Sequence, residues 1–264
     1  MIRRLGLFIA VASLFMAVSL PLSGQTAADF IRQGDEYYAQ FNNAQALDAY
    51  LKAAQAEPES YEALWKTARA YFDVSDVMTP ADSKAADEQR KTYGEAMNYA
   101  RRAIKVDPKG TWGHFFLSAA WGKYVLTQGK KEQVDASKQI KAEIDKAIEG
   151  DPNNDLAYHA LGRWHRRMAE IGGAQRFFGG LIYGGIPKGT LEDSEKNMKK
   201  AIELNPDYTN HHLELGRTYL GMKKPDLAKP EFEKALALPD TTSKCPAYKK
   251  EAQAELDALN KKGK

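Results

Sequence analysis

Three arginines close together in the chain, Arg163, Arg166 and Arg167, have a spacing that suggests ligand chemistry. Like charges so near one another repel unless an anion lies beside them. A guanidinium group holds a carboxylate or phosphate through two parallel hydrogen bonds, and aromatic rings supply stacking surface for the rest of a ligand. The candidate ligand-binding residues are Trp65, Arg69, Trp112, Phe115, His159, Arg163, Arg166, Arg167 and Arg217.

This set of side chains suits an acidic peptide, a free C-terminus or an anionic lipid headgroup. The alternative is structural: each arginine pairs with an Asp or Glu of a neighbouring helix, and the rings pack the inner wall of the protein. Both interpretations remain open at the level of the sequence.

The histidines and glycines form no catalytic or cofactor-binding pattern. None of the five histidines has the spacing to a carboxylate that a metalloprotease or a paired metal site requires. His211 and His212 are adjacent and so face different sides of a helix. The glycine pairs between residues 172 and 185 lack the lysine and the strand of a phosphate-binding loop. We therefore predict no enzyme activity, no cofactor and no metal site.

The elements that must position the candidate residues are the helices of a repeat. A tetratricopeptide (TPR) unit is a helical hairpin of ~34 residues, with small residues where its two helices approach, aromatic residues beside them and a proline at its end. A large side chain at the small positions would hold the helices apart. Seven residues of the first unit meet this pattern: Phe30, Gly34, Tyr37, Ala46, Tyr50, Ala53 and Pro58.

The pattern starts again near Tyr61, Thr111, Asp155 and Thr209. The turns of the second, third and fourth units exceed the template by roughly 16, 10 and 20 residues. Residues 247–260 have helical spacing and a lysine-rich polar side, which is typical of a terminal cap. The predicted fold is all-α, an α-solenoid of about five TPR hairpins with a C-terminal capping helix.

In a TPR solenoid the first helices of successive hairpins line a concave groove. The candidate residues occupy the repeat positions that face this groove. The sequence therefore predicts that the arginines and aromatic side chains converge on one surface.

Two of the long turns differ in character. Residues 171–190 carry large apolar side chains among paired glycines, which indicates either a lid over the core of the solenoid or a mobile flap over an apolar ligand. These side chains are Phe177, Phe178, Leu181, Ile182, Tyr183 and Ile186. Residues 74–90 are polar, and we expect a solvated loop or a short helix there.

The start of the chain has the layout of a secretory signal peptide. Arg3 and Arg4 precede an uncharged apolar run, and small residues follow it before Gln25. We predict a signal peptide at residues 1–24, a TPR domain at residues 25–264, and a periplasmic or secreted protein that is not an integral membrane protein after cleavage. A retained membrane anchor is the alternative.

The charge balance gives no reason to expect a nucleic acid partner. The chain has 38 Lys and Arg against 35 Asp and Glu, and removal of Arg3 and Arg4 with the signal peptide leaves 36 basic residues. Cys245 is the single cysteine, so no internal disulfide can form.

The order of motifs resembles that of the regulator of microtubule dynamics family. The motifs are Leu64-Trp65-Lys66, Ala68-Arg69-Ala70-Tyr71, Tyr99-Ala100-Arg101-Arg102-Ala103, Ile144-Asp145-Lys146-Ala147, Leu161-Gly162-Arg163-Trp164, Ile186-Pro187 and Leu215-Gly216-Arg217-Thr218-Tyr219-Leu220. The resemblance covers most of residues 60–240 and implies a TPR-like fold linked to microtubules or, through an N-terminal anchor, to organelle membranes. The signal-peptide layout favours a bacterial, exported relative.

These observations predict a non-catalytic interaction protein that binds an acidic or C-terminal peptide of an unidentified partner protein in its groove. The alternative is a carrier of a lipid or another hydrophobic anionic ligand under the glycine-rich flap at residues 171–190.

Overall fold

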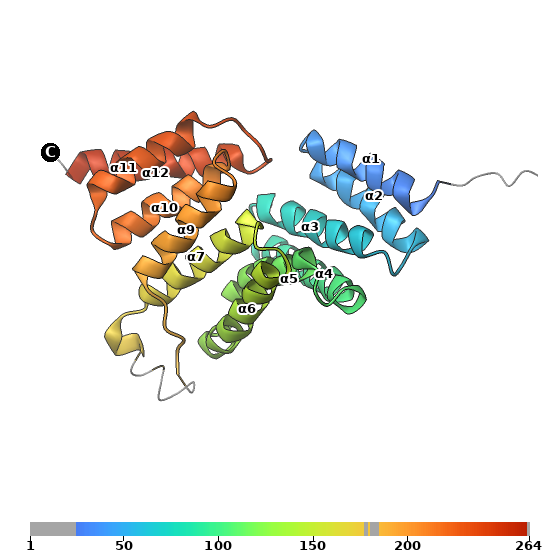
Figure 1. Cartoon of the computed structure of the whole chain (residues 1–264), viewed down its shortest axis with the longest axis horizontal. Coiled ribbons are helices and arrows are strands. Elements are labelled where there is room, and N and C mark those ends of the chain that lie inside the picture. Colours follow the sequence, from blue (N-terminus) through green and yellow to red (C-terminus); the bar gives the residue numbers. More distant parts are fainter. Residues whose placement is uncertain (1–24, 177–178, 180–184, 263–264) are drawn as a thin grey trace, which may run out of the picture.

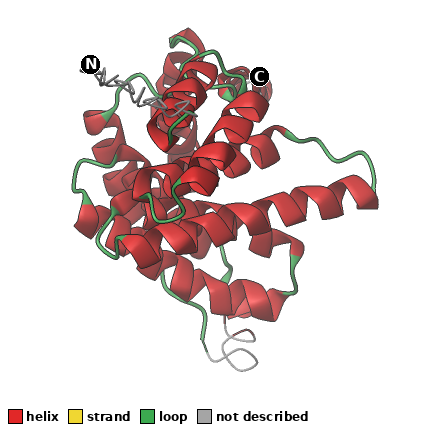
Figure 2. Cartoon of the chain, turned by 90° about the vertical axis from the view of Figure 1, so that its right-hand side faces the viewer, coloured by secondary structure: helices red, strands yellow, loops and turns green. Residues whose placement is uncertain are grey.

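A computed structural model of the chain describes residues 25–176, 179 and 185–262. These residues form helices and connecting loops, and the described part of the chain holds no strand (Figure 2). Successive helices pack in pairs, and the pairs follow one another along a curved solenoid (Figure 1). The prediction of an all-α TPR solenoid is confirmed.

The bounds of the helices follow the predicted repeats. The pairs are α1 (Ala27–Ala39) with α2 (Asn43–Ala56), α3 (Tyr61–Val77) with α4 (Ser83–Val106), α5 (Thr111–Tyr124) with α6 (Lys130–Gly150), α7 (Asp155–Ala169) with α9 (Leu191–Leu204), and α10 (Thr209–Gly221) with α11 (Pro225–Ala237). A short 3-10 helix (Val125–Thr127) precedes α6, and α12 (Cys245–Lys262) packs against α11 and α10 where the cap was expected.

Capping side chains set the start of six helices. In each, an oxygen of the residue before the helix accepts a hydrogen bond from the backbone N–H three residues later, which stabilises the helix by about 1 kcal/mol. The caps are Thr26, Asn42, Ser60, Asp82, Asn154 and Thr190. Local sequence therefore decides where these helices begin.

In the first and last hairpins a glycine of one helix faces an aromatic ring of the paired helix. A Cβ atom on Gly34 would lie 2.4 Å from Cε1 of Tyr50, and one on Gly216 would lie 2.4 Å from Cε1 of Phe232. Tyr50 and Phe232 are fully buried. The space that a larger residue would fill is therefore taken by the aromatic ring of the paired helix.

The long turn of the second hairpin is mostly helical, with a short loop at residues 78–82. Helix α3 continues to Val77, and α4 begins at Ser83 after its cap Asp82, so both helices are longer than the template. The expectation of a loop at residues 74–90 is correct only for the mostly exposed residues 78–82, because the residues on either side extend the existing helices.

The predicted flap at residues 171–190 lies partly outside the described residues. Of its six large apolar side chains, only Ile186 belongs to the described part of the chain. The predicted signal peptide at residues 1–24 also lies outside it.

The two ends of the described solenoid are joined by a short segment between α11 and α12, residues 241–244, which we term the latch segment. Asn43 of α2 donates a hydrogen bond of 2.9 Å from Nδ2 to Oγ of Ser243. Lys244 donates to the backbone carbonyl of Asp76 in α3 and lies 3.3 Å from the carboxylate of the same residue. The segment reaches from the orange-red end of the chain toward α2 and α3 (Figure 1). The curved groove is thus bridged across its open side.

Candidate functional site

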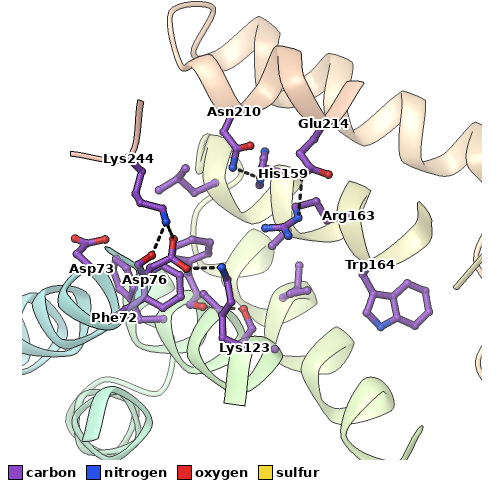
Figure 3. A pocket seen from close by; sticks show the side chains of 18 of the residues that line it. Phe72, Asp73, Asp76, Lys123, His159, Arg163, Trp164, Asn210, Glu214 and Lys244 are labelled. Atoms are coloured by element: carbon purple, nitrogen blue, oxygen red, sulfur yellow. Dashed lines mark hydrogen bonds and ion pairs between the residues drawn. The ribbon is translucent and has the colours of Figure 1, made fainter. Parts of the chain in front are cut away.

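The interior of the curve holds a cavity of about 710 Å³. Its walls come from α3, α5, α7 and α10, which are first helices of their hairpins, together with parts of α6, α12 and the latch segment. Figure 3 shows its lining side chains converging from these elements. The cavity is therefore the concave groove of the solenoid, enclosed by the latch segment.

Most of the predicted binding residues line this one cavity. Eight of the nine do so: Trp65, Arg69, Trp112, Phe115, His159, Arg163, Arg167 and Arg217. Arg166 is not among the lining residues, because its guanidinium is held by Glu214 and Glu170. That these residues bind a ligand stays a prediction.

One wall of the cavity is aromatic. The rings of Trp65 and Trp112 stack with their centroids 5.2 Å apart, and Phe116 lies parallel to Trp65 at 6.2 Å. Phe115 meets Phe116 edge to face at 4.9 Å. Such a wall offers apolar contact area and stacking to the stem of a ligand.

Glu214 of α10 neutralises most of the arginine cluster. It lies 3.6 Å from Nε of Arg163 and 3.3 Å from Nη1 of Arg217, and it also accepts a hydrogen bond from Arg166. Burial alone would raise the pKa of Glu214, but the adjacent guanidinium groups lower it far below its usual range. Each of these three arginines therefore has a carboxylate neighbour among the described residues, as the structural alternative expects.

Arg167 is the exception. It lines the cavity and makes no hydrogen bond or ion pair with any residue of the described part of the chain, and Glu214 and Glu170 act on it only at longer range. Burial and the nearby Arg163 lower its pKa to about 10. The Nε atom of Arg163 is also buried without a hydrogen-bond partner among the described residues. This end of the cavity therefore has an uncompensated positive charge.

At the opposite end of the cavity, α3 carries two carboxyl groups, Asp73 and Asp76 (Figure 3). Asp76 is paired with Lys123 and Lys244 and accepts a hydrogen bond of 3.1 Å from the hydroxyl of Tyr93. Burial opposes its ionisation, but the two lysines lower its pKa. Asp73, one turn earlier, has no ion pair among the described residues, and burial raises its pKa to about 7.

His159 contributes to the cavity wall through a fixed network rather than as a free base. Asn210 lies 3.3 Å from Nε2 of His159, whose Nδ1 lies 3.0 Å from Nδ1 of His211. Nε2 of His211 lies 2.9 Å from the carboxylate of Asp155. This chain is satisfied when both imidazoles are neutral, and burial lowers the pKa of both histidines.

Sequence reasoning missed several charged residues of the cavity. Asp73 and Asp76 follow Arg69 at spacings that put all three on one face of α3, and this signal was available. Lys244 carried no signal, because it lies in a segment outside the repeats. Within the described residues, no group of three His, Cys, Asp or Glu side chains could hold a metal ion. The same residues contain no helix that combines the length and apolar character needed to span a bilayer.

Solved structures place the fold among TPR proteins. The structure of TTC0263, a thermophilic TPR protein of Thermus thermophilus, superposes with a TM-score of 0.63 at 17% identity, over 87% of this chain and 100% of that one. At this identity the likeness concerns the fold alone.

Two proteins of animals are similar in sequence. Regulator of microtubule dynamics protein 1 of Mus musculus is 29% identical over 205 residues, which are 77% of this chain and 66% of that protein. The protein of the same name from Caenorhabditis elegans is 25% identical over 214 residues, which are 79% of this chain and 90% of that protein. This chain therefore spans just under two thirds of the mouse relative.

These relatives correct the predicted location. The expectation of a periplasmic or secreted protein is wrong, because the similar proteins come from animals and are named as regulators of microtubules, which are filaments of the cell interior. A periplasm is a compartment of bacteria.

The match to a family extends along almost all of the described chain. Residues 30–261 match the family described as regulator of microtubule dynamics protein 1-3, and this range contains every helix from α2 to α11. It also contains the latch segment and all of the cavity lining. The chain belongs to the regulator of microtubule dynamics family.

Proposed function

We propose that this chain is a non-catalytic TPR interaction protein that holds an acidic or carboxy-terminal peptide of a partner in its central cavity. The TPR fold is a scaffold for protein–protein interaction, and membership in a family of regulators favours a role without catalysis. The carboxylate of the peptide would lie against Arg167 and Arg163.

The observation that carries this proposal is the lack of an anionic partner for Arg167 among the described residues of the cavity. Arg167 is partly buried, and a cation that is withdrawn from water without a counter-ion is costly. A bound carboxylate would offset that cost through charge-assisted hydrogen bonds. Glu214 is already shared by Arg163, Arg166 and Arg217, so it has little capacity left for Arg167.

The aromatic wall supports a peptide rather than a small inorganic anion. Trp65, Trp112 and Phe115 present ring faces and edges that suit the apolar side chains of a peptide. An inorganic anion would leave this surface unused.

Binding can be tested with a library of acetylated heptapeptides that is made once with free and once with amidated C-termini. Three of the four tryptophans, Trp65, Trp112 and Trp164, line the cavity, so their fluorescence reports its occupancy. Peptides with a free carboxylate should bind, and amidation or the change Arg167→Met should weaken them about tenfold or more. Added salt should weaken the wild type in the same direction.

The matched control is Arg32→Met, which removes an exposed arginine of α1 that pairs with Asp29. It should leave binding unchanged. Equal binding of free and amidated peptides, or full binding by Arg167→Met, would refute the proposal.

A carrier of a lipid or another hydrophobic anionic ligand is the second candidate. It is favoured by the enclosure of the cavity, which the latch segment bridges and aromatic side chains line. Native mass spectrometry of the purified chain decides between the two, because a carrier retains a small ligand through purification. A copurifying mass that is lost in Arg167→Met would favour the carrier.

Microtubules are the first macromolecular partner that we propose to test, because the relatives are named as regulators of their dynamics. Co-sedimentation of the chain with polymerised tubulin is the measurement, with Arg167→Met beside Arg32→Met. Loss of co-sedimentation in Arg167→Met alone would assign the interaction to the cavity.

A further inference from the structure

Asp73 is a carboxyl group on the cavity wall that an anion-binding role leaves unused. Its Oδ2 atom is buried and has no hydrogen-bond partner in the described part of the chain. Asp76, one turn later on the same helix, receives two lysines and a tyrosine hydroxyl. The two acids share a face of α3, yet only Asp76 is neutralised by the protein.

Arg69, one turn before Asp73 on α3, makes its hydrogen bond and ion pair with other residues, and its buried Nε atom has no hydrogen-bond partner among the described residues. Arg69 donates a hydrogen bond of 2.8 Å to the hydroxyl of Tyr50, and its guanidinium lies 3.7 Å from the ring centroid of Tyr38. Its ion pair, at 3.8 Å, is with Asp35 rather than Asp73. Arg69 therefore favours the ionised form of Asp73 through its charge, but it makes no direct hydrogen bond or ion pair with Asp73 among the described residues.

Two groups of opposite charge type on the cavity wall lack a partner among the described residues, and we term them the two poles. The Oδ2 atom of Asp73 on α3 lacks a donor, and Arg167 on α7 lacks an acceptor among the described residues. Helix α5 packs against both α3 and α7, and Lys123 near its end pairs with Asp76, whereas Trp112 and Phe115 near its start line the part of the cavity beside Trp65. Figure 3 shows Asp73 and Arg163 on different sides of the cavity.

A purely anionic occupant would satisfy only one of these poles. It would leave the buried Oδ2 of Asp73 without a hydrogen-bond donor. A buried polar atom without a partner weakens binding, because its lost hydration is not replaced. An occupant that also carries a cation would satisfy both, with the aromatic wall against its apolar stem.

We propose that the occupant is bipolar: a peptide end whose free carboxylate binds Arg163 and Arg167 and whose basic side chain, Lys or Arg, binds Asp73. This inference rests on the proposed function and narrows the class of peptide. The basic side chain stands at a fixed number of residues before the carboxylate, because both poles are parts of rigid helices.

The heptapeptide library tests the inference directly, with wild type, Asp73→Asn and the control Asp48→Asn. Asp48 is an exposed acid of α2 that pairs with Lys52. Wild type and Asp48→Asn should enrich Lys or Arg at one position, and exchange of that lysine for norleucine should weaken binding at least about tenfold. Asp73→Asn should lose this preference and keep its dependence on the free carboxylate.

The norleucine exchange needs no variant, so the test holds even if Asp73→Asn folds poorly. The bipolar occupant is refuted if the wild type shows no preference for Lys or Arg. It is also refuted if a folded Asp73→Asn keeps the full preference, and in both cases the proposed carboxylate site is unaffected. A lysine preference without dependence on the carboxylate instead overturns the proposed function and leaves Asp73 as a cation site. Failure to bind any peptide overturns both.

Discussion

Lys244 and Asp76 are 168 residues apart in the chain, and the ammonium group of Lys244 bonds to the backbone carbonyl of Asp76 and lies 3.3 Å from its carboxylate. Asp76 belongs to the second hairpin, and Lys244 follows the last one. A TPR solenoid holds together through contacts between neighbouring repeats, and it needs no such bond between distant ones. The latch segment is therefore a feature of this cavity rather than of the repeat.

Removal of the latch bond should open the cavity more than it unfolds the protein. In Lys244→Ala we expect a loss of about 1 kcal/mol in the free energy of unfolding, since Asp76 keeps Lys123. Quenching of tryptophan fluorescence by acrylamide should rise, because Trp65 and Trp112 line the cavity. Glu203→Ala, which breaks an exposed pair with Lys200 on α9, should leave quenching unchanged.

Closure of the first hairpin should depend on the absence of a side chain at residue 34. In Gly34→Ala the new methyl group would overlap the ring of Tyr50, so we expect a loss of about 1 to 3 kcal/mol. Gly94→Ala on α4 is the control, because no atom lies within 4 Å of the added Cβ. It should stabilise the protein by about 0.5 to 1 kcal/mol. Urea unfolding measures both, and equal effects would contradict the packing argument.

Acidification should destabilise the fold through the neutral pair His159 and His211. Burial lowers the pKa of both below the ordinary 6.5. Below about pH 6.5 both histidines are protonated in the unfolded chain but stay neutral in the folded chain. The free energy of unfolding therefore decreases as pH falls. Each unit of difference between the folded and unfolded pKa amounts to about 1.4 kcal/mol.

His114 should act in the opposite sense. Its hydrogen bond to Glu143 raises its pKa, so its contribution is present at low pH and is lost as pH rises through the folded pKa. Unfolding at pH 5.5 and 7.5 should thus show a smaller acid loss in His159→Gln and a larger one in His114→Gln than in the wild type. Parallel pH profiles for all three proteins would exclude this account.

Asp73 should lower the stability of the ligand-free protein. Burial raises its pKa from 3.8 to about 7, so stability falls as pH rises between these values. The charged groups that face it are Arg69, Asp76 and Lys244, with the hydroxyl of Tyr38. Asp73→Asn should therefore be more stable than the wild type by about 1 to 3 kcal/mol at pH 8, and by less at pH 5. A variant that is less stable at pH 8 would contradict this.

The stability of the fold around Arg163, Arg166 and Arg217 should depend on Glu214. Its side chain is 3% exposed, and its change to Gln leaves three guanidinium groups with one fewer anion, so we expect a loss of about 3 to 5 kcal/mol. Glu251→Gln alters a partner of Arg217 that is 48% exposed, and it should lower the stability by at most about 1 kcal/mol. Arg167→Met should be neutral or stabilising in thermal unfolding, since it removes an unpaired cation.

The sequence by itself determined the repeat, the pairing of helices and the face on which the cavity forms. Each of these depends on contacts within one hairpin or between neighbours, and such contacts leave a periodic pattern in the chain. Gly34 opposite Tyr50 and Gly216 opposite Phe232 follow this pattern, and so do the eight predicted residues that line one cavity. The TPR pattern assigns no positions to the inserted residues 74–90. Their continuation of helices α3 and α4 was therefore not predicted.

Only the tertiary structure decided which charges are neutralised. Arg163 and Arg166 of α7 share Glu214, which belongs to another hairpin, whereas Arg167, in the same run of sequence, has no such partner in the described chain. Asp73 and Asp76 are one turn apart, and Lys244, far along the chain, reaches only the second. The physical reason is that ion pairs depend on separations of a few ångströms between residues distant in sequence, and no repeat pattern encodes those separations.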